Sequence, residues 1–184
     1  MRFFFFCLAR GTGADRTTGI GGVLDAYLGS SSSSSVVCDP HVAHLLFSAN
    51  RWETSAAIRA HLAKGTHVIV DRYSASGIAY SIANGLDPDW CTHSDRGLPT
   101  PDAVLYLDVT AEQAEKRAGF GGERYERREF QERVAKAYAT LRSRTRGWHD
   151  VDGNGTSEVV AARVELAALA CISSPTSGSA GSVA

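Results

Sequence analysis

Two stretches, THVIVD at residues 66–71 and AVLYLDV at residues 103–109, decide the fold class of this 184-residue chain. Each is short, apolar and rich in β-branched residues. A run without alternating polar residues is typical of a strand buried on both faces of a parallel sheet. Because segments with helical spacing lie between and after these runs, the sequence predicts an α/β domain around a parallel sheet.

The clearest helical segment is 41–64, where Leu45, Ala49 and Trp52 recur and Gly65 stands in the position of a C-cap glycine. Further helices are expected at 111–117, with Thr110 placed to N-cap it, at 130–146 and at 158–170. The serine run 30–35 indicates a flexible loop, and the Ser/Gly/Ala-rich end at 173–184 indicates a disordered tail.

Composition excludes several classes of protein. The chain is 43% hydrophobic and 21% charged, with a formal net charge of -1, which gives no reason to expect a nucleic acid or a membrane surface as a partner. Its four cysteines form no C-x-x-C pair, which suits a reducing compartment such as the cytoplasm, with the nucleus or an organelle left open. The opening MRFFFFCLA is interpreted as a buried strand rather than a signal peptide.

The first candidate binding element is HLLFSANRWE at 44–53. Phe47 and Arg51 are four residues apart on the predicted helix, so they share one face. An aromatic ring beside a guanidinium can stack on a planar base and hydrogen-bond its edge. A core Phe47 with a solvated Arg51 is an equally good interpretation of the pattern alone.

A second group of polar residues follows the strand at 66–71. Asp71 can orient a magnesium ion or its water, and Arg72 can clamp a phosphate, because ligands of parallel sheets bind at the carboxyl ends of strands. The alternative is an aspartate that caps the next helix and pairs with its neighbour. Ser76 and Gly77 are expected in a turn that permits close backbone approach, and Tyr80 is spaced to line the same pocket.

The third element is RAGFGGERYE at 117–126, which carries Arg117 and Arg124 among three glycines. Such a mobile, arginine-bearing flap suits phosphoryl transfer, although an ordinary exposed loop has the same composition. Scattered histidines and the lack of H-E-x-x-H and G-x-S-x-G motifs argue against a zinc hydrolase and a serine hydrolase.

The order and spacing of four motifs resemble thymidylate kinase of the eukaryotic type. They are HLLFSANRWE, VIVDRYSASGIAYS at 68–81, the stretch 90–102 ending in GLPTPD, and GFGGERYERREFQERV at 119–134. The similarity runs from about residue 15 to residue 169. It implies the parallel sheet of the P-loop nucleoside monophosphate kinases, flanked by helices, and transfer of a phosphoryl group from ATP to dTMP with Mg²⁺. A homodimer is also implied.

The resemblance also implies roles for individual residues. The dTMP site would comprise Arg16, Phe47, Arg51, Arg72, Ser76, Gly77, Tyr80, Tyr125 and Gln131. Phe47 would stack on thymine and Arg51 would read its edge. Asp71, Arg72 and Arg117 would be catalytic, with Asp71 acting indirectly on magnesium, and Arg117 and Arg124 would belong to a lid.

The family's phosphate loop, G-x-x-x-x-G-K-[ST], has no match before the D-R-T-T segment at 15–18, and Gly11-Thr12-Gly13 is followed by no lysine. We therefore expect the domain at 1–172 to be N-terminally incomplete, without its first strand and loop, a segment on the order of 30 residues. Residues 2–10 are expected to form an edge strand. Such a chain would be poorly active; the alternative is a non-catalytic nucleotide-binding or partner protein derived from a thymidylate kinase.

Overall fold

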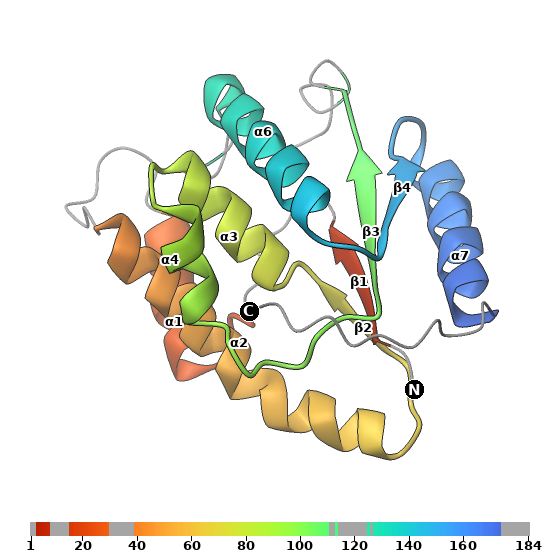
Figure 1. Ribbon diagram of the computed structural model, residues 1–184, viewed down its shortest axis with the longest axis horizontal. Helices are drawn as coiled ribbons and strands as arrows, with labels where there is room; N and C mark the ends of the chain where they lie inside the picture. Colours follow the sequence, from red (N-terminus) through yellow and green to blue (C-terminus); the bar gives the residue numbers. More distant parts are fainter. Residues whose placement is uncertain are drawn as a thin grey trace.

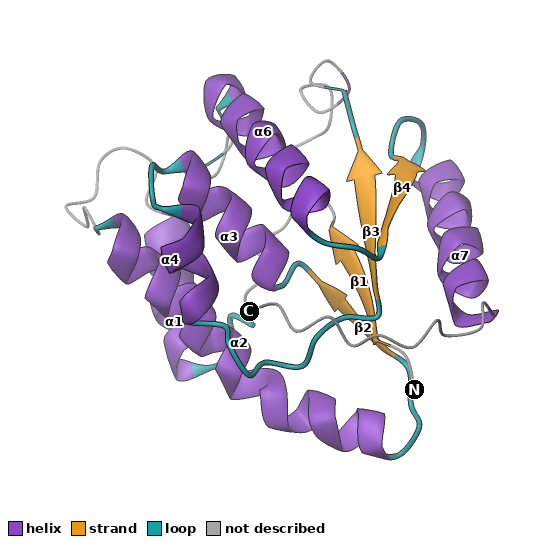
Figure 2. Cartoon of the chain, viewed as in Figure 1, coloured by secondary structure: helices purple, strands orange, loops and turns teal. Residues whose placement is uncertain are grey.

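The computed structural model describes residues 3–7, as backbone, and residues 15–29, 39–110, 113, 125 and 127–173. Its elements are β1 Phe3–Cys7, α1 Gly19–Gly29, α2 Pro40–Ala63, β2 Val68–Asp71, α3 Ser74–Ala83, α4 Pro88–His93, β3 Ala103–Asp108, α6 Arg128–Arg144, β4 Trp148–Asp152 and α7 Ser157–Ser173. Figures 1 and 2 show the strands side by side, with helices on either side of them. The predicted α/β domain with a parallel sheet is confirmed.

The described strands form one parallel sheet in the order β2-β1-β3-β4. β1 lies in the interior, with Phe4 opposite Ile69 of β2 on one side and opposite Ala103 of β3 on the other. The expectation of an edge strand at 2–10, and of a missing strand between 66–71 and 103–109, was therefore wrong. An interior strand hydrogen-bonds to the backbone groups of both neighbouring strands, whereas an edge strand pairs on one side only. A run of consecutive apolar residues suits the interior position, where both faces of the strand are buried. Residues 8–14, which follow β1, lie outside the described part.

Helices cover both faces of the sheet because β3 is apolar on both. Its Leu105 and Leu107 pack with Val151 of β4 against α7. The alternate residue Val104 packs instead with Ile58 of α2 and the partly buried Val68 of β2. Within the described residues, no helix has the length and apolar character needed to cross a membrane.

The predicted helix at 41–64 is confirmed as α2. The Asp39 side chain accepts the His41 N–H, Pro40 occupies the first turn, and Gly65 has a φ of 77° just past the helix end. Of the apolar residues that revealed this helix, Leu45 lies on its exposed side, and Trp52 is 40% exposed while its Nε1 donates to Ser94 O at 2.9 Å. Its buried side is polar, with His44, Ser48, Arg51 and Ser55 among the residues it covers.

Other local expectations had mixed outcomes. The helices at 130–146 and 158–170 are confirmed as α6 and α7. Ser76 and Gly77 lie inside α3, so the predicted turn was wrong; the Gly77 N–H donates to Tyr73 O at 3.0 Å, as in a helix. Thr110 accepts the Gln113 N–H at 3.3 Å, as an N-cap does, but the rest of 111–117 lies outside the described residues. So do the serine run 30–35 and the tail from residue 174.

Candidate functional site

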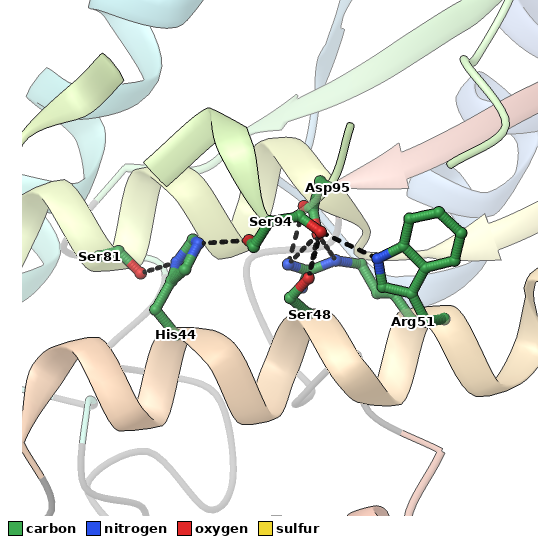
Figure 3. Close-up of polar contacts among 7 residues, drawn as sticks. His44, Ser48, Arg51, Ser81, Ser94 and Asp95 are labelled. Carbon is green, nitrogen blue, oxygen red and sulfur yellow. Dashed lines mark hydrogen bonds and ion pairs between the residues drawn. The ribbon is translucent and has the colours of Figure 1, made fainter. Parts of the chain in front are cut away.

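The polar side of α2 faces α3 and the segment that follows α4, and Figure 3 shows the contacts between them. Side chains at helical spacing on α2 reach across to serine and aspartate partners there. These contacts join Arg51 and Ser48 to Asp95, and His44 to Ser81 and Ser94. Such hydrogen bonds compensate for the burial of polar side chains and give them a defined geometry.

Arg51 and Asp95 form a buried ion pair, with 6% of each side chain exposed. Arg51 Nη2 donates to Asp95 Oδ2 at 2.8 Å and to Oδ1 at 3.0 Å, and Nε donates to Oδ1 at 3.3 Å. Ser48 Oγ donates to Oδ1 at 2.7 Å and to Ser94 O at 3.0 Å, which fixes the carboxylate from the helix side. The guanidinium is therefore held at Nε and Nη2, and none of the hydrogen bonds between described residues uses Nη1.

Gly77 provides the space into which Nη1 of Arg51 extends. A Cβ built on Gly77 would lie 2.7 Å from Arg51 Nη1 and 2.9 Å from Nη2, closer than non-bonded atoms approach. Gly77 is helical and its φ is not positive, so proximity rather than backbone conformation requires glycine here. The sequence pattern S-x-S-G anticipated a close backbone approach without identifying what approaches.

His44 is 1% exposed and has both ring nitrogens in hydrogen bonds, Nδ1 to Ser81 Oγ at 2.7 Å and Nε2 to Ser94 Oγ at 2.9 Å. Burial lowers the pKa of His44, and the positive charge of Arg51 lowers it further. Because a serine hydroxyl can both donate and accept, a neutral imidazole satisfies both partners. His44 therefore joins α2, α3 and the segment after α4 without adding charge.

The carboxyl end of β2 carries Asp71 and Arg72. Arg72 has a φ of 57°, a left-handed conformation that is unusual outside glycine. Its Nη2 donates to the hydroxyl of Tyr80 at 2.7 Å, and its guanidinium carbon lies 5.0 Å from the centre of that ring. Loss of part of its water shell raises the pKa of Asp71, and the charge of Arg72 offsets part of the rise. Backbone strain and a cation–π contact together give Arg72 a defined direction.

An aromatic cluster joins Tyr80 of α3 to Tyr125 and to Phe130 of α6. Gln131 Nε2 donates to Tyr125 O at 2.8 Å and approaches the Tyr80 hydroxyl at 3.5 Å. Tyr125 shares a 2.7 Å hydroxyl contact with Tyr27 of α1. The half-buried Phe47 packs against the cluster that contains Tyr27, so one aromatic surface runs from α2 to α6.

Arg16 lies in the turn that precedes α1. Its guanidinium pairs with Asp25, and both side chains are substantially exposed, at 37% and 55%. Arg16 is thus the most accessible of the arginines expected to meet substrate in the described residues. Hydrogen bonding from Thr17 lowers the pKa of Asp15, the residue before it.

The structure joins Arg72, Tyr80, Tyr125 and Gln131 into one group, and places Gly77 against Arg51. Arg117 and Arg124 lie outside the described residues. The residues that sequence reasoning missed are the partners His44, Ser48, Asn50, Asp95 and Tyr27. His44, Ser48 and Asn50 stand inside the stretch 44–53, and Asp95 inside the stretch 90–102, both of which carried the resemblance, whereas Tyr27 lies outside all four motifs.

The described residues contain no group of three or more histidine, cysteine, aspartate or glutamate side chains placed to hold a metal ion. The carboxylate of Asp71, at the carboxyl end of β2, is of the type that can act through water on a magnesium ion held mainly by phosphates, because Mg²⁺ retains several waters in such sites.

Comparison with known proteins agrees with the motifs. The family model for thymidylate kinase matches residues 12–164. The chain is 44% identical over 164 residues to thymidylate kinase of Arabidopsis thaliana, covering 89% of this chain and 60% of that protein. It is 42% identical over 148 residues to that of Homo sapiens, covering 79% and 68%.

A solved structure of thymidylate kinase from Candida albicans superposes with a TM-score of 0.73 at 31% identity, covering 92% of each chain. Relative to the Arabidopsis thaliana and Dictyostelium discoideum proteins, the chain spans 60% and 54% of their length. The region matched by the family model lies within the single domain expected at 1–172 and includes every helix and strand from α1 to β4. The chain belongs to the thymidylate kinase family.

Proposed function

We propose that this chain carries the dTMP-binding half of a thymidylate kinase, which transfers the γ-phosphoryl group of ATP to dTMP and yields dTDP for dTTP synthesis. The observation that carries the proposal is the fixed guanidinium of Arg51, whose Nη1 faces the space above Gly77. Arginine only donates hydrogen bonds, so this group favours a carbonyl on the base edge, as in thymine, over the amino group of cytosine.

The remaining roles follow the path from base to phosphate. Phe47, one turn from Arg51, stacks on thymine. Ser76, Gly77 and Tyr80 border the deoxyribose, where the Tyr80 ring discourages a ribose hydroxyl. Arg16 and Arg72 bind the phosphate, and Tyr125 and Gln131 close over the nucleotide from the far side. The contacts of Arg72 and Gln131 with the Tyr80 hydroxyl support this arrangement.

The transfer step depends on positioning and charge stabilisation rather than on covalent chemistry. Arg72 aligns the accepting phosphate, Arg117 stabilises the transferring group, and Arg124 belongs to the same lid. Asp71, at the carboxyl end of β2, would orient the water ligands of Mg²⁺, which would supply charge neutralisation when bound with the phosphates of ATP.

The 184 residues contain no G-x-x-x-x-G-K-[ST] run, which in this family cradles the phosphates of ATP. We therefore propose that the chain binds dTMP well and turns it over poorly. A non-catalytic nucleotide-binding protein, or a partner of a complete kinase, is the second candidate. A coupled ADP-release assay with dTMP, ATP and Mg²⁺ separates the two: slow but measurable turnover supports the first and no turnover supports the second, whereas turnover near that of ordinary kinases would contradict both.

The binding proposal is tested by calorimetric titration with dTMP, dCMP and dGMP. We expect dTMP to bind at least about 10-fold more tightly than dCMP. Arg51→Lys keeps the charge opposite Asp95 but lacks the planar guanidinium, whose second terminal nitrogen would reach the base, so it should abolish this preference. Arg128→Lys, at an exposed pair with Glu132, is the matched control and should change neither affinity. Equal binding of dTMP and dCMP by the unaltered chain would refute the proposal.

We also propose a homodimer and a cytoplasmic location. Val42 and Leu45 of α2 are 48% exposed each, on the side away from the polar network, and an apolar helix face of this kind suits a symmetric contact. Sedimentation of the chain and of Leu45→Glu tests the dimer, which the charged variant should dissociate. The free, buried thiol of Cys91 supports a reducing compartment.

A further inference from the structure

Asn50, next to Arg51 on α2, is 3% exposed and clamps the turn that carries Arg16. Its Oδ1 accepts the Asp15 N–H at 2.9 Å, and its Nδ2 donates to Asp15 O at 3.2 Å. Nδ2 also donates to Thr18 Oγ1 at 3.0 Å and to Glu53 Oε2 at 2.9 Å. The amide orientation is determined by these partners, because the reverse orientation would set its oxygen against a carbonyl and a carboxylate.

The same turn is fixed from two further sides. Thr18 Oγ1 donates to Glu53 Oε2 at 2.7 Å and accepts the Gly21 N–H at 2.9 Å. Asp15 Oδ1 accepts from the backbone N–H of Thr17 at 3.0 Å and from its hydroxyl at 2.6 Å. A Cβ on Gly21 would lie 1.8 Å from Asp15 O, so the turn rests directly on α1. Residues 15–18 are thus held rigidly between α1 and α2.

We propose that Asn50 is a positioning residue, which sets the backbone of Arg16 so that its guanidinium reaches the phosphate of the bound nucleotide. Asn50 contacts Asp15, directly before Arg16, and Thr18, two residues after it. The Arg16 side chain itself is exposed and pairs with Asp25, so the hydrogen bonds of Asn50 position the backbone of Arg16 and do not contact its guanidinium. This inference rests on the proposed dTMP site.

The experiment compares affinities for dTMP and thymidine, which differ by the phosphate. In Asn50→Ala we expect dTMP to bind about 10-fold more weakly, as for a lost hydrogen bond to a charged group, while thymidine affinity stays within about 2-fold. A double-mutant cycle with Arg16→Ala then tests the route of the effect. Once Arg16 is removed, Asn50→Ala should cause no further loss of dTMP affinity.

Thr54→Ala is the matched control on the same helix, because the hydrogen bond that Thr54 Oγ1 makes within the described part of the chain goes to the Arg51 carbonyl, at 3.0 Å, and not to the turn. Should Asn50→Ala fail to fold, Thr18→Val carries the test, since it removes the hydroxyl that links Asn50 to the turn and is expected to weaken dTMP about 3-fold. Equal losses for dTMP and thymidine, an undiminished effect without Arg16, or no effect would each overturn the inference. An unaltered chain that binds neither ligand overturns the proposed function as well, which is a separate result.

Discussion

The site contains two arginine–aspartate pairs that differ in almost every physical respect. Arg51 and Asp95 are each 6% exposed and share three hydrogen bonds, with Ser48 as a further donor to the carboxylate. Arg16 and Asp25 meet at one contact near the surface, where 37% and 55% of the side chains are exposed. A buried arginine held by several hydrogen bonds to one carboxylate has one orientation. An arginine in an exposed ion pair can leave its carboxylate for another anion at little cost in free energy.

This difference matches what each arginine is proposed to bind. A base edge is recognised by direction, which requires a guanidinium that cannot turn. A phosphate is recognised largely by charge, and an arginine that leaves one carboxylate for another anion loses little in the exchange. The fixed pair therefore suits selection of the base, and the exposed pair suits capture of the phosphate, with Asn50 fixing only its backbone.

The largest expected effect comes from breaking the buried pair. Asp95→Ala leaves the Arg51 charge buried without its partner, so the free energy of unfolding should fall by about 3–5 kcal/mol. Asp25→Ala, at the exposed pair, should change it by less than about 1 kcal/mol. Urea unfolding of both variants measures the contrast. Similar losses at the two sites would contradict the distinction between a fixed and an exchangeable arginine.

A second effect is expected from glycines in two helices. Gly77→Ala places a methyl 2.7 Å from Arg51 Nη1, and Arg51 cannot move away without breaking its bonds to Asp95, so we expect a loss of about 1–3 kcal/mol. Gly22→Ala in α1 meets nothing within 4 Å and should stabilise by about 0.5–1 kcal/mol, as alanine does in helices. Thermal unfolding measures the change in stability of both variants. Stabilisation by Gly77→Ala would show that Arg51 is mobile.

The third effect depends on pH and tests whether the network around Arg51 excludes a second charge. The pKa of His44 is lowered in the folded chain, so below its ordinary value of 6.5 the unfolded chain binds a proton that the folded chain does not. Stability should then fall as pH falls, by up to about 1.4 kcal/mol per pH unit. His44→Gln should lack this component. Identical slopes between pH 6.5 and 5 in both proteins would contradict a neutral, buried His44.

Several helices and strands could be predicted from short stretches of the sequence alone. α2 begins and ends within one residue of its predicted limits because Pro40 and Gly65 act on their immediate neighbours. The strands at 66–71 and 103–109 were also predicted from a local signal, namely their own apolar, β-branched residues. The interior position of β1 was not predicted, because a run of phenylalanines specifies burial without specifying which neighbours bury it. α3 was missed because Tyr73 offers no side-chain cap and its first turn is made of small residues.

The site was predictable in its residue types but not in its partners. Phe47 and Arg51 were identified because they lie one turn apart on one helix. Asp95 is 44 positions from Arg51, and only the folded chain brings its carboxylate to the guanidinium. Asn50 was missed for the same reason, since its contact with Asp15 spans 35 positions. Local spacing identifies candidate side chains, while the contacts that orient them depend on tertiary structure.

The smallest expected effect concerns the exposed pair and is the most specific test of its exchangeability. In Asp25→Asn, Arg16 loses a competing anion while the shape of the neighbouring side chain is kept. We expect dTMP affinity to rise by about 2–3-fold at low salt, consistent with the small worth of an exposed pair. The gain should vanish near 1 M salt, where charges more than about 3 Å apart are screened.

Isothermal titration at two salt concentrations measures this gain, and thymidine provides the internal control because it has no phosphate for Arg16 to bind. Asp95→Asn, at the buried pair, should instead weaken both ligands at both salt concentrations, since it loosens the orientation of Arg51 itself. If Asp25→Asn also weakened dTMP binding, Asp25 would be holding Arg16 toward the phosphate. Arg16 would then be held in one orientation by Asp25, as Arg51 is by Asp95. The two pairs would differ in burial but not in role.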